Sequence, residues 1–225
     1  AIPKRYQGLS ARLTYGFRDT YMLDLNFGYT GSENFQPGRR FGFFPSVAVG
    51  WVPTQYELLK DSKWLNFLKI RASYGLTGRD NTAPWQWMQI YAQDANKGTV
   101  FGEGMGNDSS NRITINKNNS AVNTGVAWDK SYKMNIGVDA RFLDNRLSVT
   151  FDAYREWNRE MLMNIAENVQ SVIGTQSAAV NKGEMNNWGY ELSLTWRDKI
   201  GKDFKYRVGI NTGYSDNEVL NMDWE

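Results

Sequence analysis

Eight stretches of this chain alternate apolar and polar residues with a period of two, and their apolar positions carry almost no charge. The clearest stretch places Trp188, Tyr190, Leu192, Leu194 and Trp196 on one face. Alternation of this kind predicts β-strands, because successive side chains of a strand point to opposite faces. Aliphatic residues between two aromatic ends are typical of a strand that crosses a bilayer, where the rings lie at the headgroup level. The pattern therefore predicts membrane-spanning strands.

The connections between the predicted strands alternate between short and long. Tight turns are expected at Asp19-Thr20 and Asp144-Asn145, and one helical turn is expected at 56–60. Long connections are expected at about 31–41, 78–130 and 156–187, and a short strand could lie at 85–91. Outer-membrane barrels sort their connections in this way, with short periplasmic turns and long extracellular loops. We therefore predict an all-β, antiparallel transmembrane β-barrel. Its strands are expected at 9–17, 21–30, 45–51, 68–77, 132–142, 147–154, 188–196 and 204–214.

Charged residues avoid the centre of the predicted outward face. A lysine or arginine at the middle of the bilayer costs about 2–4 kcal/mol, and only Arg155, at the end of the sixth predicted strand, is a doubtful case. A soluble β-sandwich is the alternative, but its loops would not be sorted by side or reach about 50 residues. The charges gather on the opposite face, which is the lumenal face of a barrel, at Arg12, Asp24, Lys69, Arg71, Asp139, Arg141, Asp152, Glu191, Lys205 and Arg207.

The composition narrows the classes of function. The 225 residues include no histidine and no cysteine, which removes the usual general base, the commonest metal ligand and thiolate chemistry. No run approaches the roughly 18 consecutive apolar residues of a transmembrane helix. The net charge of +2 gives no sign of a nucleic-acid partner. We expect no cofactor and no metal site, since the loop carboxylates Asp108, Asp216 and Glu218 lack the spacing of a calcium loop.

Several segments carry a family resemblance. Residues 34–51 contain Phe-Phe-Pro-Ser followed by a Gly-Trp strand end, and residues 64–78 read Phe-Leu-Lys-Ile-Arg-Ala-Ser-Tyr-Gly-Leu-Thr-Gly from Phe67 onward. These segments resemble the SusC/RagA family of TonB-dependent outer-membrane transporters of Bacteroidetes. Further matches occur in the same order at 135–139, 142–149, 189–196 and 217–220.

The resemblance implies a larger protein. Members of the family have a TonB box, a plug domain and a barrel of 22 strands, which is the plugged class of barrel. Residues 1–225 contain no motif of the plug or the TonB box, so the resemblance implies a partial barrel domain with about eight of the strands. It also implies an integral outer-membrane protein, in contact with lipid, that imports oligosaccharides or oligopeptides. The implied partners are a SusD-like surface lipoprotein and, through parts outside this chain, the TonB complex.

Two other functions are weighed against import. A self-contained eight-stranded barrel with a structural or adhesin role would require the first and eighth strands to pair. An outer-membrane enzyme would need a carboxylate pair or a Ser/Lys arrangement, and no spacing in the sequence singles one out. We therefore expect that the chain is not an enzyme.

Two sets of residues are candidates for ligand contact. Trp85, Trp87 and Tyr91 could stack on sugar rings, while packing within the loop or against the lipoprotein is the other interpretation. The lumenal charges could tune the passage of ligand, or they could form pairs across the lumen or hold the plug. These charges are Arg71, Asp139, Arg141 and Asp152.

Overall fold

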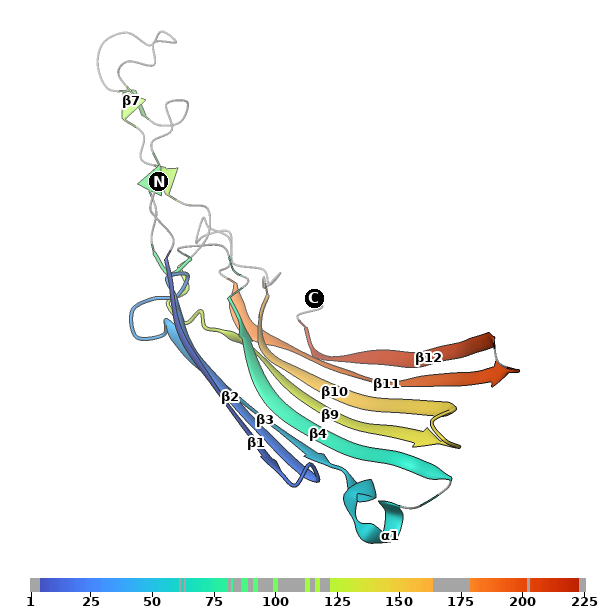
Figure 1. The fold of residues 1–225 in the computed structure, drawn as a ribbon. Helices are drawn as coiled ribbons and strands as arrows, with labels where there is room; N and C mark the ends of the chain where they lie inside the picture. The colour runs from blue at the N-terminus through green and yellow to red at the C-terminus, as the bar shows by residue number, and fades with distance from the viewer. Residues whose placement is uncertain are drawn as a thin grey trace.

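A single antiparallel sheet of eight strands makes up most of the computed structural model (Figure 1). The structure describes residues 5–60, 62, 64–80, 82, 86–88, 91–92, 99–100, 112–113, 116–117, 122–163, 179–201 and 203–222. The all-β, antiparallel prediction is confirmed. In spatial order the strands are β1 (Tyr6–Phe17), β2 (Tyr21–Ser32), β3 (Phe41–Trp51), β4 (Leu65–Arg79), β9 (Asp129–Phe142), β10 (Leu147–Met163), β11 (Val180–Ile200) and β12 (Phe204–Asn221).

The sheet is a curved, open wall, with the short connections at one end (Figure 1). In the part of the chain that is described, β1 pairs only with β2 and β12 pairs only with β11. A closed eight-stranded barrel is therefore the wrong interpretation of this chain. Two free edges cannot face lipid, so the wall needs further strands to complete it.

The remaining elements lie in the connections. Between β3 and β4, the 3₁₀ helix η1 (Pro53–Gln55) and the single turn α1 (Glu57–Lys60) confirm the expected helical turn. Two short antiparallel pairs of strands lie between β4 and β9. In one, β5 (Tyr91–Ala92) pairs with β8 (Asn116–Lys117); in the other, β6 (Thr99–Val100) pairs with β7 (Arg112–Ile113). No helix in the described part of the chain has the length and apolar character needed to cross a bilayer.

Two rows of cross-strand partners on the apolar face show that the strands are tilted in the membrane. The first row passes from aliphatic residues at β1 to aromatic and charged residues at β12, and the second passes from aromatic to mainly aliphatic residues. A row perpendicular to strands that tilt by about 35–45° climbs through the bilayer, which accounts for both trends. The first row is Leu13, Leu25, Val47, Tyr74, Met134, Arg155, Trp188 and Asp216; the second is Phe17, Tyr21, Trp51, Ile70, Val138, Phe151, Leu192 and Thr212.

This tilt explains the doubtful position of Arg155. Arg155 pairs directly with Trp188, and its guanidinium lies 5.3 Å from the centre of the Trp157 ring. Both tryptophans belong to the aromatic boundary at the long-loop end of the strands. The charge of Arg155 therefore lies at headgroup height, where a cation on the lipid face costs little.

Several strands are longer than the sequence pattern predicts. The connection expected at 156–187 is strand up to Met163 and again from Val180, and β12 continues to Asn221, past the strand end expected at residue 214. Beyond the bilayer both faces of a strand meet water, so the period-two pattern that marks its centre is lost. A bulge between Asn158 and Met161, with Glu160 at a φ of 53°, further disrupts the alternation.

Candidate functional site: the lumenal face and its outer rim

A three-residue charge network lies at the centre of the lumenal face. The Arg71 Nε donates to Asp139 Oδ2 at 3.1 Å, and Arg71 Nη2 donates to Asp152 Oδ2 at 2.7 Å. Thr150 Oγ1 donates to the other oxygen of Asp139 at 3.1 Å. One guanidinium on β4 therefore holds carboxylates on two further strands, β9 and β10.

Gly137 allows this reach across two strands. Arg71, Gly137 and Asp152 are consecutive partners in the register, so the guanidinium crosses directly over the glycine. A Cβ built on Gly137 would lie 2.5 Å from Arg71 Cζ, which is closer than the two atoms can approach. The missing side chain is thus a requirement of the network.

Gly137→Ala is expected to break the network while leaving the barrel folded, because the atom displaced is the end of a flexible side chain. We expect a loss of about 1 kcal/mol of stability, the scale for partly exposed ion pairs. The measurement is the temperature at which the full-length protein stops migrating as a folded barrel on a denaturing gel. Gly28→Ala is the matched control, since nothing lies within 4 Å of its added Cβ. Equal shifts in the two variants would contradict the role given to Gly137.

Arg141 lies on the same face but outside the network. Its guanidinium is 5.2 Å from the centre of the Phe67 ring, and its cross-strand partners are Phe67 and Ser148. The structure thus brings together Arg71, Asp139 and Asp152 and leaves Arg141 one row nearer the short turns. Whether any of the four contacts ligand stays a prediction.

The three candidate aromatic residues are only partly described. Trp85 lies outside the described residues, and Tyr91 lies in β5, where the backbone alone is described. Trp87 is half-buried in the turn at 86–88. Stacking of sugar rings on these side chains therefore remains a prediction.

A second group of ion pairs, which the sequence reasoning missed, lies at the outer rim of the lumenal face. Glu156 Oε1 accepts from Ser131 Oγ and lies 3.3 Å from Arg79 Nη2 and 3.6 Å from Lys133 Nζ. On the opposite, outward face of β9, Lys130 pairs with Glu160 at 2.7 Å. Glu156 and Lys133 are direct cross-strand partners, so extending the sixth predicted strand past residue 154 would have revealed their pairing.

An apolar cluster anchors the outer connections to the wall. Phe35 and Val126 are buried with Trp128, and Phe44 and Leu162 pack against them. The centres of the Phe35 and Trp128 rings are 5.1 Å apart. Trp128 Nε1 donates to the carbonyl of Arg40 at 3.1 Å. The segments 33–40 and 122–128 are therefore held as one unit above β3 and β10.

Asn181 ties the same unit to β10 and β11. Its side-chain amide exchanges hydrogen bonds with both backbone groups of Ala127 at 3.0 Å, and Nδ2 also donates to the carbonyl of Glu160 at 2.8 Å. Asp129, beyond the aromatic boundary at the start of β9, accepts from the amide of Leu162 at 2.9 Å. Burial raises the pKa of Asp129, although this hydrogen bond opposes the shift. Buried apolar contacts and hydrogen bonds therefore hold the rim connections to the strands.

Known proteins of similar sequence are TonB-dependent receptors. Residues 3–223 match the family described as TonB dependent receptor-like, beta-barrel. The chain is 28% identical over 211 residues to TonB-dependent receptor P3 of Formosa agariphila, covering 94% of this chain and 20% of that protein. It is 27% identical over 212 residues to TonB-dependent receptor SusC of Bacteroides thetaiotaomicron, with the same coverage of 94% and 20%. The chain therefore spans about a fifth of the length of these curated relatives.

Solved structures show the same fold. The RagAB peptide importer in its "open-open" state matches with a TM-score of 0.82 at 23% identity, covering 97% of this chain and 22% of that chain. The "closed-closed" state of the importer matches with a TM-score of 0.81 at 24% identity, covering 96% of this chain and 22% of that chain. At this level of identity the likeness concerns the fold alone.

Proposed function

This chain belongs to the TonB-dependent receptor-like β-barrel family, and on that premise we propose that it forms part of the wall of a nutrient importer. The family consists of receptors and transporters rather than enzymes, as the sequence predicted. The chain is part of an integral protein of the bacterial outer membrane. The cargo we propose is an oligosaccharide or oligopeptide, drawn in by the TonB complex.

The observation that carries this proposal is that the two faces of the sheet have the characters expected of a large barrel that conducts a ligand: one suits lipid, and the other suits a polar lumen. The outward face is apolar with an aromatic boundary, while the lumenal face is polar and internally ion-paired. The fold also matches the RagAB peptide importer over 97% of this chain, which supports a wall of the same architecture.

The proposed partner is a SusD-like surface lipoprotein, which would lie over the long connections as a lid. The anchored rim supports this docking role, because loops held by Phe35, Trp128 and Asn181 offer a defined surface. Residues 1–225 are the partial barrel domain in this proposal, and its three long connections, with the outer parts of the strands that flank them, face the cell exterior.

The proposal is tested in the organism that makes the full-length protein. The gene is deleted, and growth is measured on a panel of oligosaccharides and oligopeptides and on the matching free sugars and amino acids. We expect growth to be lost on one class of oligomer and kept on its monomers. The tagged protein should also co-purify with a lipoprotein. Unchanged growth on every oligomer, with no lipoprotein partner, would overturn the import function.

A further inference from the structure

Arg155 is an exposed cation on the lipid face of β10, at the aromatic boundary of the long-loop end. Its direct cross-strand partners are Met134 on β9 and Trp188 on β11, and its guanidinium lies 5.3 Å from the centre of the Trp157 ring. Paired strands therefore flank this residue on both sides. No ion pair joins Arg155 to a carboxylate in the part of the chain that the structure describes.

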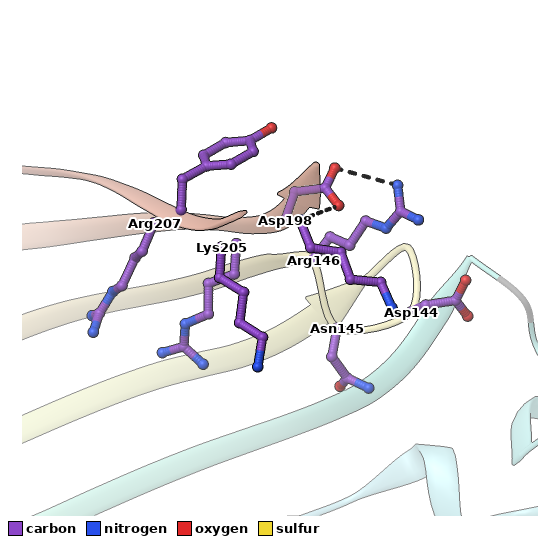
Figure 2. A pocket seen from close by; sticks show the side chains of 9 residues that line it. Asp144, Asn145, Arg146, Asp198, Lys205 and Arg207 are labelled. Atoms are coloured by element: carbon purple, nitrogen blue, oxygen red, sulfur yellow. Dashed lines mark hydrogen bonds and ion pairs between the residues drawn. The ribbon is translucent and has the colours of Figure 1, made fainter. Parts of the chain in front are cut away.

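The strands next to Arg155 offer it no carboxylate. Arg146, directly before the other end of β10, does have one, because Asp198 on β11 lies 3.4 Å away (Figure 2). Around Arg155, by contrast, the nearest outward positions of both neighbouring strands are uncharged. They are Tyr132, Met134 and Ile136 on β9, and Asn186, Trp188 and Tyr190 on β11.

A carboxylate two strands away is blocked. The Arg71 guanidinium crosses two strands to its farther partner only because Gly137, which lies between them, has no side chain. Arg155 and Asp216 are also two strands apart in one row of cross-strand partners, but Trp188 lies between them. The indole occupies the path that a glycine would leave open. Arg155 therefore lacks the kind of bridge that neutralises Arg71.

The cations that lie farther out on the same face are already neutralised. Lys130 and Arg159 are direct cross-strand partners beyond the aromatic boundary. Lys130 Nζ lies 2.7 Å from Glu160 Oε1, and Arg159 Nε lies 3.4 Å from Glu184 Oε2. Arg155 differs from both, because it lies lower, among rings, with its charge unmatched.

We propose that Arg155 binds the phosphate group of a lipid in the leaflet around the long-loop end, and so holds a lipid molecule against β9, β10 and β11. The counter-charge that fits is an anion at headgroup height, where membrane lipids carry phosphate. A planar guanidinium suits phosphate, because two of its N–H groups can donate in parallel. Towards the bilayer centre, the next outward residue of β10 is Ala153, a small side chain over which an acyl chain would lie. The inference rests on the membrane location of the barrel and not on its cargo.

Photo-crosslinking of the full-length protein in dodecyl maltoside micelles tests the proposal. A benzophenone amino acid replaces Ala153, which leaves Arg155 in place, and Met134 is a second probe position if the first variant folds poorly. The micelles contain either phosphatidic acid or the diacylglycerol with the same acyl chains, so the two lipids differ only in the phosphate. We expect the phosphatidic acid to be linked at least about fivefold more than the diacylglycerol.

Substitutions then assign this preference to one side chain. Arg155→Gln is expected to lower the ratio of the two yields to about one, whereas Arg155→Lys should keep part of the preference. Arg141→Gln is the matched control, since this lumenal guanidinium lies 5.2 Å from the centre of the Phe67 ring, and the ratio should not change. Equal linking of the two lipids, or a preference that survives Arg155→Gln, would overturn the lipid site. Because the readout needs no substrate and no energised import, it can fail while the import function stands.

Discussion

Arg71→Gln is expected to destabilise the full-length barrel by about 2 kcal/mol, more than any other single change on the lumenal face. The substitution removes the guanidinium that bridges Asp139 and Asp152, and it leaves these two carboxylates close together without that cation between them. The side chains of the three residues are about one-third exposed or less, which places the cost between that of a surface pair and a fully buried pair. The measurement is the temperature at which the folded barrel is lost on a denaturing gel.

A second substitution tests the cause of this loss. Arg71→Gln/Asp152→Asn removes one of the two unpaired carboxylates and is expected to recover about half of the lost stability. Arg141→Gln is the control, since it removes a lumenal cation that has an aromatic contact but no carboxylate partner among the described residues. A loss from Arg141→Gln as large as that from Arg71→Gln would contradict the network.

The centres of the strands could be predicted from sequence because the bilayer imposes a strong, local pattern. Each position of the spanning segment faces either lipid or lumen, so Val138 and Asp139 take opposite characters as neighbours. The strand ends could not be predicted in this way. From Asn181 to Asn187 both faces of β11 carry polar residues, and nothing in the alternation marks them as strand.

The lumenal site was predictable as a set of residues but not as a set of contacts. The alternation of side chains between the two faces of each strand assigns one face to four residues: Arg71, Asp139, Arg141 and Asp152. Only the register between the strands, however, places Gly137 beneath the Arg71 guanidinium. Register depends on pairing between strands that are far apart in sequence, since β4 and β9 are separated by the longest connection. The same holds at the short-turn end of β11 and β12, where Lys205 and Arg207 were assigned to the lumen but their cross-strand partners Lys199 and Arg197 were not.

Val138→Arg is expected to prevent stable insertion of the barrel into the outer membrane. Val138 lies on the lipid face between Ile70 and Phe151, in the aliphatic part of its row. A guanidinium there has no carboxylate partner in lipid and costs about 2–4 kcal/mol. The amount of folded, heat-resistant protein in purified outer membranes measures the effect, and little or none should be found.

A second position on the same strand provides the control, because the cost of a charge on the lipid face depends on how deep in the bilayer it lies. Tyr132 lies on the same face of β9, six residues from Val138, between Leu76 and Trp157 at the aromatic boundary. Tyr132→Arg is therefore expected to cost about 0–1 kcal/mol and to leave the barrel inserted, as the natural Arg155 does on the adjacent strand β10. Arg141→Ala, on the lumenal face, should also insert. If Val138→Arg inserts as well as these two variants, the assignment of this face to lipid is wrong, and with it the tilt deduced from the two rows.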